Sequence, residues 1–256
     1  MSERFTDRVV WIVNAGEPIA QAVAKAFAAE GAKKLVLSGV ESAPADLNVE
    51  AKCYPVPVND EIARATVKEN EDIDTYVFVQ PDSPDMDIEH CTPEFWDEHL
   101  MLGVGANYAA IRAVIRVMAP RKKGTFLSIV SYHDEKPNGL KLMLSVCASG
   151  SNMLMREAAQ DYGRLEGLFR CNVLQVGPLD GDEERMEAGL NHLYYTLDSR
   201  IPRGAAGTID EIVKPALFLC SDDANYINGA TLRVDGGMLG YYGDGDSKAR
   251  FEYGYA

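Results

Sequence analysis

Short, continuous apolar runs recur along the chain, and stretches with helical periodicity separate them. A strand that is buried on both faces produces such a run, whereas a helix with one buried face repeats apolar residues every three to four positions. The runs predict six strands: Arg8–Val13, Leu35–Leu37, Asp74–Gln80, Thr125–Val130, Cys171–Val176 and Thr231–Asp235.

Amphipathic stretches fill the intervals. The first predicted helix carries Ile19, Val23 and Phe27 on one face, and Gly31 ends it. A second helix is predicted to begin at Thr92-Pro93, and a third to bury Val104, Ile111, Ile115 and Met118. A fourth is predicted over Met153 to Tyr162. A fifth follows a capping box at Thr208–Glu211 and runs toward Cys220, with a kink or late start at Pro215. The alternation predicts an α/β fold with a doubly wound parallel sheet, and without repeats or long linkers we expect one domain over residues 1–256.

The composition indicates a globular protein: 46% of the residues are hydrophobic and 25% are charged. The formal net charge of −14 disfavours binding to nucleic acid or to an anionic membrane. No apolar run reaches the length of a membrane span, and residues 1–8 lack the apolar core of a signal peptide. Five scattered cysteines (Cys53, Cys91, Cys147, Cys171 and Cys220) fit reduced thiols, so we expect a cytoplasmic protein.

Two short clusters carry possible metal ligands without the spacing of a metal site. His90-Cys91 has no second His or Cys at ligand spacing, and Asp244-Gly-Asp246 lacks the further acids of a calcium loop. We therefore expect no metal. The acidic segment Asp82–Glu89 predicts a solvated face.

The last third of the chain carries a specific series of motifs: Ile201-Pro-Arg-Gly204, Glu211-Ile-Val, Leu217–Ala224 and Asn228–Gly237. With these motifs the chain resembles the short-chain dehydrogenase/reductase family over nearly its whole length. The resemblance implies a Rossmann-type fold in three layers. In the family a glycine-rich loop binds a dinucleotide, and Asn, Ser, Tyr and Lys form the catalytic tetrad.

The loop after the first strand departs from the family's TGxxxGxG pattern. The aligned stretch keeps Gly16, while Asn14 replaces the first glycine and Ala20 replaces the last. Pro18 removes a backbone N–H from the helix start that would hold phosphate, and Glu17 adds a charge that repels pyrophosphate. We expect a simple strand-to-helix turn that binds no NAD.

Three further positions that contact the cofactor in the family also differ. Gly39 stands where an acid often reads the adenosine ribose, and Glu41 comes two residues late. Pro57 replaces the adenine-contacting Asp, and the NNAG motif falls at Phe78–Pro81. These losses support the expectation that this chain holds no cofactor.

The catalytic tetrad is lost at three of its four positions. The resemblance places Gly103 at the Asn position, Val146 at the Tyr position and Gly150 at the Lys position. None of these side chains can donate, accept or carry a proton. Only Ser131 remains, and one hydroxyl without its base does not move a hydride.

The surviving serine is followed by Tyr132, His133 and Asp134, which leaves two interpretations open. One is a redirected acid/base site at Ser131, Tyr132 and His133, and the other is a solvated polar loop. Gly177-Pro178 reverses the family's usual order, which indicates either a reshaped pocket wall or an ordinary turn.

We therefore expect a non-catalytic, structural or regulatory subunit of a hetero-oligomeric, NAD-dependent short-chain dehydrogenase that acts on a hydroxyacyl-CoA-type substrate. The partner would be a catalytically intact paralogue that carries the NAD, in a heterotetramer. The alternatives are a cofactor-independent lyase or isomerase that uses Ser131 and its neighbours, and a small-molecule sensor. The tail 240–256, with five aromatic residues, packs either on a partner or on its own domain.

Overall fold

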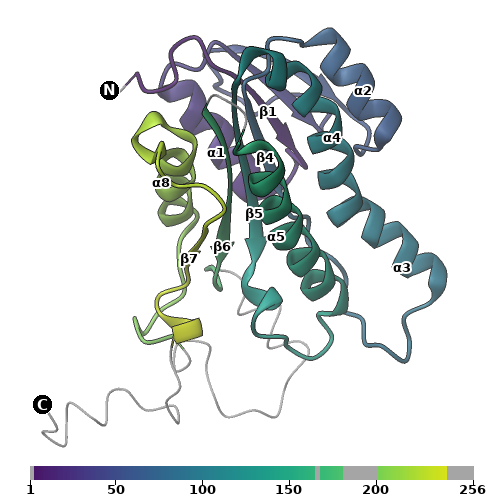
Figure 1. Cartoon of the computed structure of the whole chain (residues 1–256). Helices are drawn as coiled ribbons and strands as arrows, with labels where there is room; N and C mark the ends of the chain where they lie inside the picture. The colour runs from purple at the N-terminus through teal and green to yellow at the C-terminus, as the bar shows by residue number, and fades with distance from the viewer. Residues whose placement is uncertain (1–2, 165–167, 181–200, 241–256) are drawn as a thin grey trace, which may run out of the picture.

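A seven-stranded parallel sheet forms the centre of the computed structural model, which describes residues 3–164, 168–180 and 201–240 (Figure 1). Its strand order is β3-β2-β1-β4-β5-β6-β7. The strands are β1 (Val9–Val13), β2 (Lys34–Ser38), β3 (Glu50–Tyr54), β4 (Thr75–Val79), β5 (Lys123–Ser131), β6 (Leu168–Val176) and β7 (Thr231–Val234). This order confirms the predicted doubly wound sheet.

Helices cover both faces of the sheet (Figure 1). They are α1 (Pro18–Ala29), α2 (Asp60–Glu69), α3 (Pro93–Leu100), α4 (Ala106–Met118), α5 (Leu142–Tyr162) and α8 (Ile209–Cys220). Buried residues of α2, α4 and α5 share one apolar cluster with one face of the sheet, while α1 and α8 share a second cluster with the other face. The three layers follow from these two clusters.

Strand β1 shows why the apolar runs are continuous. Its side chains alternate between the two clusters: Trp11 packs in the one beneath α4, and its neighbours Val10 and Ile12 pack in the one beneath α1. Because successive side chains of a strand point to opposite faces, both faces must be apolar when both are covered.

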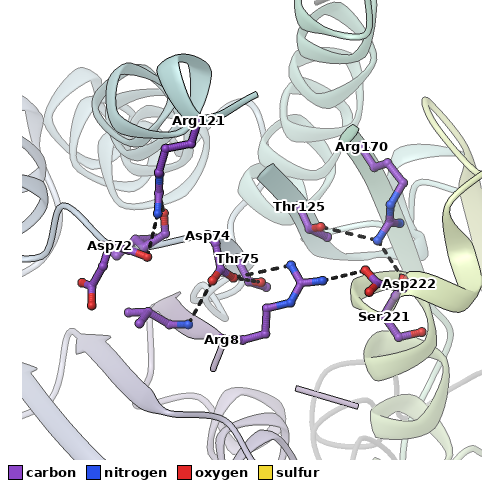
Figure 2. Close-up of polar contacts among 11 residues, drawn as sticks. Arg8, Asp72, Asp74, Thr75, Arg121, Thr125, Arg170, Ser221 and Asp222 are labelled. Carbon is purple, nitrogen blue, oxygen red and sulfur yellow. Dashed lines mark hydrogen bonds and ion pairs between the residues drawn. The ribbon is translucent and has the colours of Figure 1, made fainter. Parts of the chain in front are cut away.

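Polar side chains close the amino-terminal edge of the sheet. Figure 2 shows Arg8 between two carboxylates: its Nη2 donates to Asp222 at 2.6 Å, and its Nη1 lies 3.7 Å from Asp74. Arg170, which is 2% exposed, donates to the carbonyl of Ser221 at 2.8 Å. These contacts fasten the C-terminal end of α8 to the starts of β1 and β6.

Some elements differ from the sequence prediction. Strand β3 and helix α2 were not predicted, because half-exposed β3 has no apolar run and α2 buries only Ala63, Thr66 and Val67. Helix α5 begins at Leu142, well before the predicted Met153. Of the predicted kink or late start at Pro215, the late start is wrong, since α8 begins at Ile209 and continues through Pro215.

One helix of the described residues is long and apolar enough to cross a membrane by length and composition, contrary to the sequence expectation. This helix, Pro93–Arg121, joins α3 and α4 through a π-helical turn at Met101–Gly105, and an 18-residue window within it has a mean hydropathy of 1.3. Half of its apolar window is buried inside the protein, and α4 supplies one of the two apolar clusters. Its apolar face therefore belongs to the core of the domain.

Candidate functional site

A cavity of about 270 Å³ opens at the carboxyl ends of the central strands. Gln80 follows β4, Ser131 ends β5, and Gly177-Pro178 follow β6; the start of α1 completes the wall with Glu17 and Pro18. In open α/β sheets ligands bind at this edge, where the strand order reverses. The arrangement supports the interpretation of Gly177-Pro178 as part of a pocket wall.

The loop between β1 and α1 keeps a tight turn. Asn14 adopts a φ of 59°, and its Nδ2 donates to the carbonyl of Val79 at 2.9 Å. Glu17 is the N-cap residue, although its side chain makes no capping hydrogen bond, and Pro18 takes the first helical position. The start of α1 therefore has one N–H donor fewer and a carboxylate beside it, and both changes disfavour the binding of pyrophosphate.

The structure also describes other positions that contact the cofactor in the family. Gly39 has a φ of 89°, a conformation that strains an acidic residue at the ribose position. Gln80 is engaged within the protein: its Oε1 accepts from the N–H of Ser131 at 2.9 Å, and its Nε2 donates to the carbonyl of Leu144 at 2.8 Å. Gly16 remains in the turn, and Ala20 is fully buried against the sheet.

Packing leaves little room for a larger side chain at two of the predicted tetrad positions. A Cβ at Gly103 would lie 2.5 Å from Sγ of Cys147, so no larger residue fits there without movement. A Cβ at Gly150 would lie 3.0 Å from Cγ2 of Val104. Val146 is a half-buried residue of α5 without a titratable group.

The surviving serine contacts a histidine. The Oγ of Ser131 lies 2.6 Å from Nδ1 of His133, and the Tyr132 ring stacks on the imidazole with centroids 4.1 Å apart. Tyr132 is 5% exposed and His133 is 7% exposed. The expected solvated loop is therefore wrong at these two residues.

Burial controls the protonation of this histidine. Burial and, to a smaller extent, the nearby Lys141 ammonium lower the pKa of His133 from 6.5 to about 4, while Asp82 opposes the shift. The imidazole is neutral at neutral pH and accepts a proton only weakly. This favours a role in hydrogen bonding over a role as a general base.

The carboxylate of Asp134 binds residues of two other elements. Its Oδ1 accepts from Nε2 of Gln175 at 2.5 Å and its Oδ2 accepts from Nδ2 of Asn152 at 2.7 Å. It therefore holds the turn that follows β5 against α5 and β6 and is not a third member of a relay. Sequence adjacency predicted the cluster but not the partners of Asp134 in α5 and β6.

The possible metal ligands and the acidic segment named in the sequence analysis do not form a site together. His90 pairs with Asp87 at 2.8 Å, and within the described residues no three potential ligands lie close enough to hold a metal. Most of Asp82–Glu89 is exposed, as predicted, and Asp85 pairs with Lys141 at the cavity. Asp244-Gly-Asp246 and residues 241–256 of the tail lie outside the described residues.

Comparison with known families identifies the class. A family model described as enoyl-(acyl carrier protein) reductase matches residues 14–239. The chain belongs to the short-chain dehydrogenase/reductase family, whose fold the sheet and its flanking helices reproduce.

The curated relatives are oxidoreductases. The chain is 26% identical to the 3-oxoacyl-[acyl-carrier-protein] reductase of Escherichia coli over 247 residues, which cover 91% of this chain and 98% of the relative. It is 30% identical to the L-rhamnose-1-dehydrogenase of Scheffersomyces stipitis over 151 residues, but this match spans only 58% of the chain and 57% of the relative.

Solved structures agree on the fold. The ligand-free aldohexose dehydrogenase of Thermoplasma acidophilum has a TM-score of 0.82 at 20% identity and covers 94% of this chain and 97% of its own. Levodione reductase has a TM-score of 0.79 at 23% identity, with 93% of this chain and 100% of its own covered. At this identity the likeness concerns the fold alone.

Proposed function

We propose that this chain is a non-catalytic subunit of a hetero-oligomeric, NAD-dependent short-chain dehydrogenase. The observation that carries the proposal is the pair Val146 and Gly150 on α5, where the family pattern requires a phenol and an ammonium. Without these groups the chain cannot take the proton of an alcohol while hydride leaves.

The start of α1 supports the same conclusion for the cofactor. With Glu17 at the N-cap and Pro18 after it, the dinucleotide loop loses both an N–H donor and its favourable charge. A partner with an intact loop and tetrad would supply NAD and the Tyr/Lys pair. This chain would supply interface area and part of the substrate channel.

Among such assemblies the chain looks most like the inactive subunit of 2-[hydroxy(phenyl)methyl]succinyl-CoA dehydrogenase, which acts in anaerobic toluene degradation. A hydroxyacyl-CoA substrate, a heterotetramer with the intact paralogue and a cytoplasmic location belong to this proposal.

A cofactor-independent lyase or isomerase is the second candidate, and the contact between Ser131 and His133 favours it. The low pKa of His133, about 4, weighs against it, because so weak a base takes little proton from a substrate at neutral pH.

Co-purification tests the proposal. The tagged chain is expressed with an intact paralogue that retains YxxxK, and we expect an equimolar complex that binds NAD and oxidises a hydroxyacyl-CoA. The isolated chain is expected to bind no NAD in calorimetry and to form no NADH. Replacing the paralogue's catalytic Tyr by Phe should lower the rate of the complex by about 10²-fold or more.

The cofactor-independent lyase or isomerase predicts the opposite result for the isolated chain. It requires turnover by the isolated chain without NAD, and it requires Ser131→Ala to abolish that turnover. Tight NAD binding or unaided dehydrogenase activity of the isolated chain would refute the non-catalytic role.

A further inference from the structure

Two neighbouring loops border the cavity, and none of their residues is buried. Residues 81–92 lead from β4 to α3, and residues 135–141 lead from the short turn after β5 to α5. Each of these residues is exposed or half-exposed. Asp82 of the first loop lines the cavity together with Asn138 and Lys141 of the second. Because neither loop buries apolar side chains, it can open locally at a much smaller cost than global unfolding.

A small set of contacts, here called the clasp, joins the two loops. Met86 and Lys141 form an isolated parallel bridge. The N–H of Met86 donates to the carbonyl of Leu140 at 2.6 Å, and the N–H of Leu142 donates to the carbonyl of Met86 at 3.3 Å. The ammonium of Lys141 pairs with the carboxylate of Asp85, and their side chains are 19% and 41% exposed. Because these contacts lie on adjacent residues, we expect them to break together.

Backbone strain in the clasp favours its opening. Leu140, whose carbonyl accepts from Met86, has a φ of 68°. A leucine rarely adopts this left-handed conformation, which persists only where the surrounding contacts impose it. When the clasp opens, Leu140 can return to a negative φ, so the open state is free of this strain.

Other contacts fix both ends of the first loop. Gln80 directly precedes it, accepts from the N–H of Ser131 at 2.9 Å and donates to the carbonyl of Leu144 at 2.8 Å. At the other end, Thr92 caps α3 by accepting from the N–H of Phe95 at 3.2 Å. These contacts do not belong to the clasp, so they can stay intact while the segment between them moves.

We propose that residues 81–92 form a strap that opens locally as one unit and widens access to the cavity, and that the clasp holds this strap closed. Opening moves Asp82 out of the cavity wall and separates Asp85 from Lys141. The inference goes beyond the proposed subunit role, because it concerns a motion of the isolated chain and requires neither NAD nor a partner.

Amide hydrogen exchange of the full-length chain tests the opening. We expect the N–H groups of Met86 and Leu142 to show equal protection, far below that of β4 and β5. Asp85→Asn keeps the shape of the side chain but removes its charge, so it should raise both exchange rates about threefold, as for the loss of one partly exposed ion pair. The matched control is Glu69→Gln, which removes the exposed ion pair with Lys52 and should leave both rates unchanged.

Thiol labelling tests the access that opening provides. Leu144→Cys places a thiol in the cavity wall, and its modification by iodoacetamide can be followed by mass spectrometry. Adding Asp85→Asn should raise this labelling rate by the same factor as the exchange rates, since both require the same opening. Cys53, a half-buried thiol of β3 outside the cavity, is the internal control and should react at an unchanged rate.

Several outcomes would overturn the proposal. Protection of Met86 equal to that of β4 would mean that the strap opens only when the whole chain unfolds. Unequal protection of Met86 and Leu142, or exchange and labelling rates that Asp85→Asn leaves unchanged, would also contradict it. So would an increase in exchange that extends equally to β4 and β5, because it would report a loss of global stability.

Discussion

The two ends of the parallel sheet differ in the partners of their buried polar side chains. At the amino ends, Arg8 lies against Asp74 and Asp222, and Arg170 binds carbonyls at the end of α8 (Figure 2). At the carboxyl ends, His133 lines a cavity with Nε2 unpaired among the described residues. The first end pairs charged groups, although Nη1 of Arg8 also has no hydrogen-bond partner among the described residues, whereas the second end holds a neutral imidazole in the wall of the cavity.

The largest expected effect lies at the amino end. Arg8→Met leaves the carboxylate of Asp74 buried without its cation, and we expect the free energy of unfolding to fall by about 3 kcal/mol in urea titrations at neutral pH. Burial raises the pKa of Asp74, and loss of Arg8 would raise it further. The variant should therefore lose less stability in acid, where Asp74 is protonated, than at neutral pH.

The matched control for Arg8 is Arg64→Met, which removes an exposed ion pair with Asp60. An exposed pair contributes about 0–1 kcal/mol, so this variant should unfold nearly as the wild type does. If the two variants were equally stable, the buried network would not stabilise the amino end.

A pH titration sharpens the comparison at the carboxyl end. The pKa of His133 is lowered from 6.5 to about 4, so between these values the unfolded chain binds the extra proton. Stability should therefore fall as the pH drops through this window, by about 3 kcal/mol in total. His133→Phe should lack this part of the loss in urea titrations across the same window.

The exposed His90 provides the control for that titration, and His90→Phe should retain the wild-type pH dependence. An unchanged pH dependence in His133→Phe would mean that the imidazole is not held neutral by burial.

The smallest of the three effects concerns the π-helical turn between α3 and α4. Gly103→Asn restores the family's residue but places a Cβ against Cys147, and we expect a loss of about 2 kcal/mol. Cys147→Ala should relieve part of this loss, so a double-mutant cycle from urea titrations should give a coupling energy of roughly 1 kcal/mol. Additive effects would show that the two positions do not compete for space.

The hydrophobic pattern of the sequence was sufficient to predict most of the fold. Strand β1 and its neighbours could be predicted because burial on both faces leaves only apolar residues. Strand β3 sits at the edge of the sheet with Glu50 and Lys52 in it, so local pattern carried no signal. The first half of α5 contains Ser145, Ser149 and Gly150, residues with weak helical preference, and tertiary packing decides its state.

The site was predicted in its position but not in its contacts. Ser131 was located by the family pattern, and the lost positions followed from counting residues. The 2.6 Å contact with His133 depends on the backbone of the short turn after β5. The hydrogen bonds of Asp134 depend on Gln175 and Asn152, which are distant in sequence. Such contacts require the folded chain.

The crowding between Gly103 and Cys147 also bears on the history of this chain. A lineage that regained asparagine at position 103 would first suffer a steric clash, and one that first shortened Cys147 would gain no activity in return. Selection would favour neither intermediate. Under the proposed non-catalytic role, a gain of catalysis would therefore need several changes together.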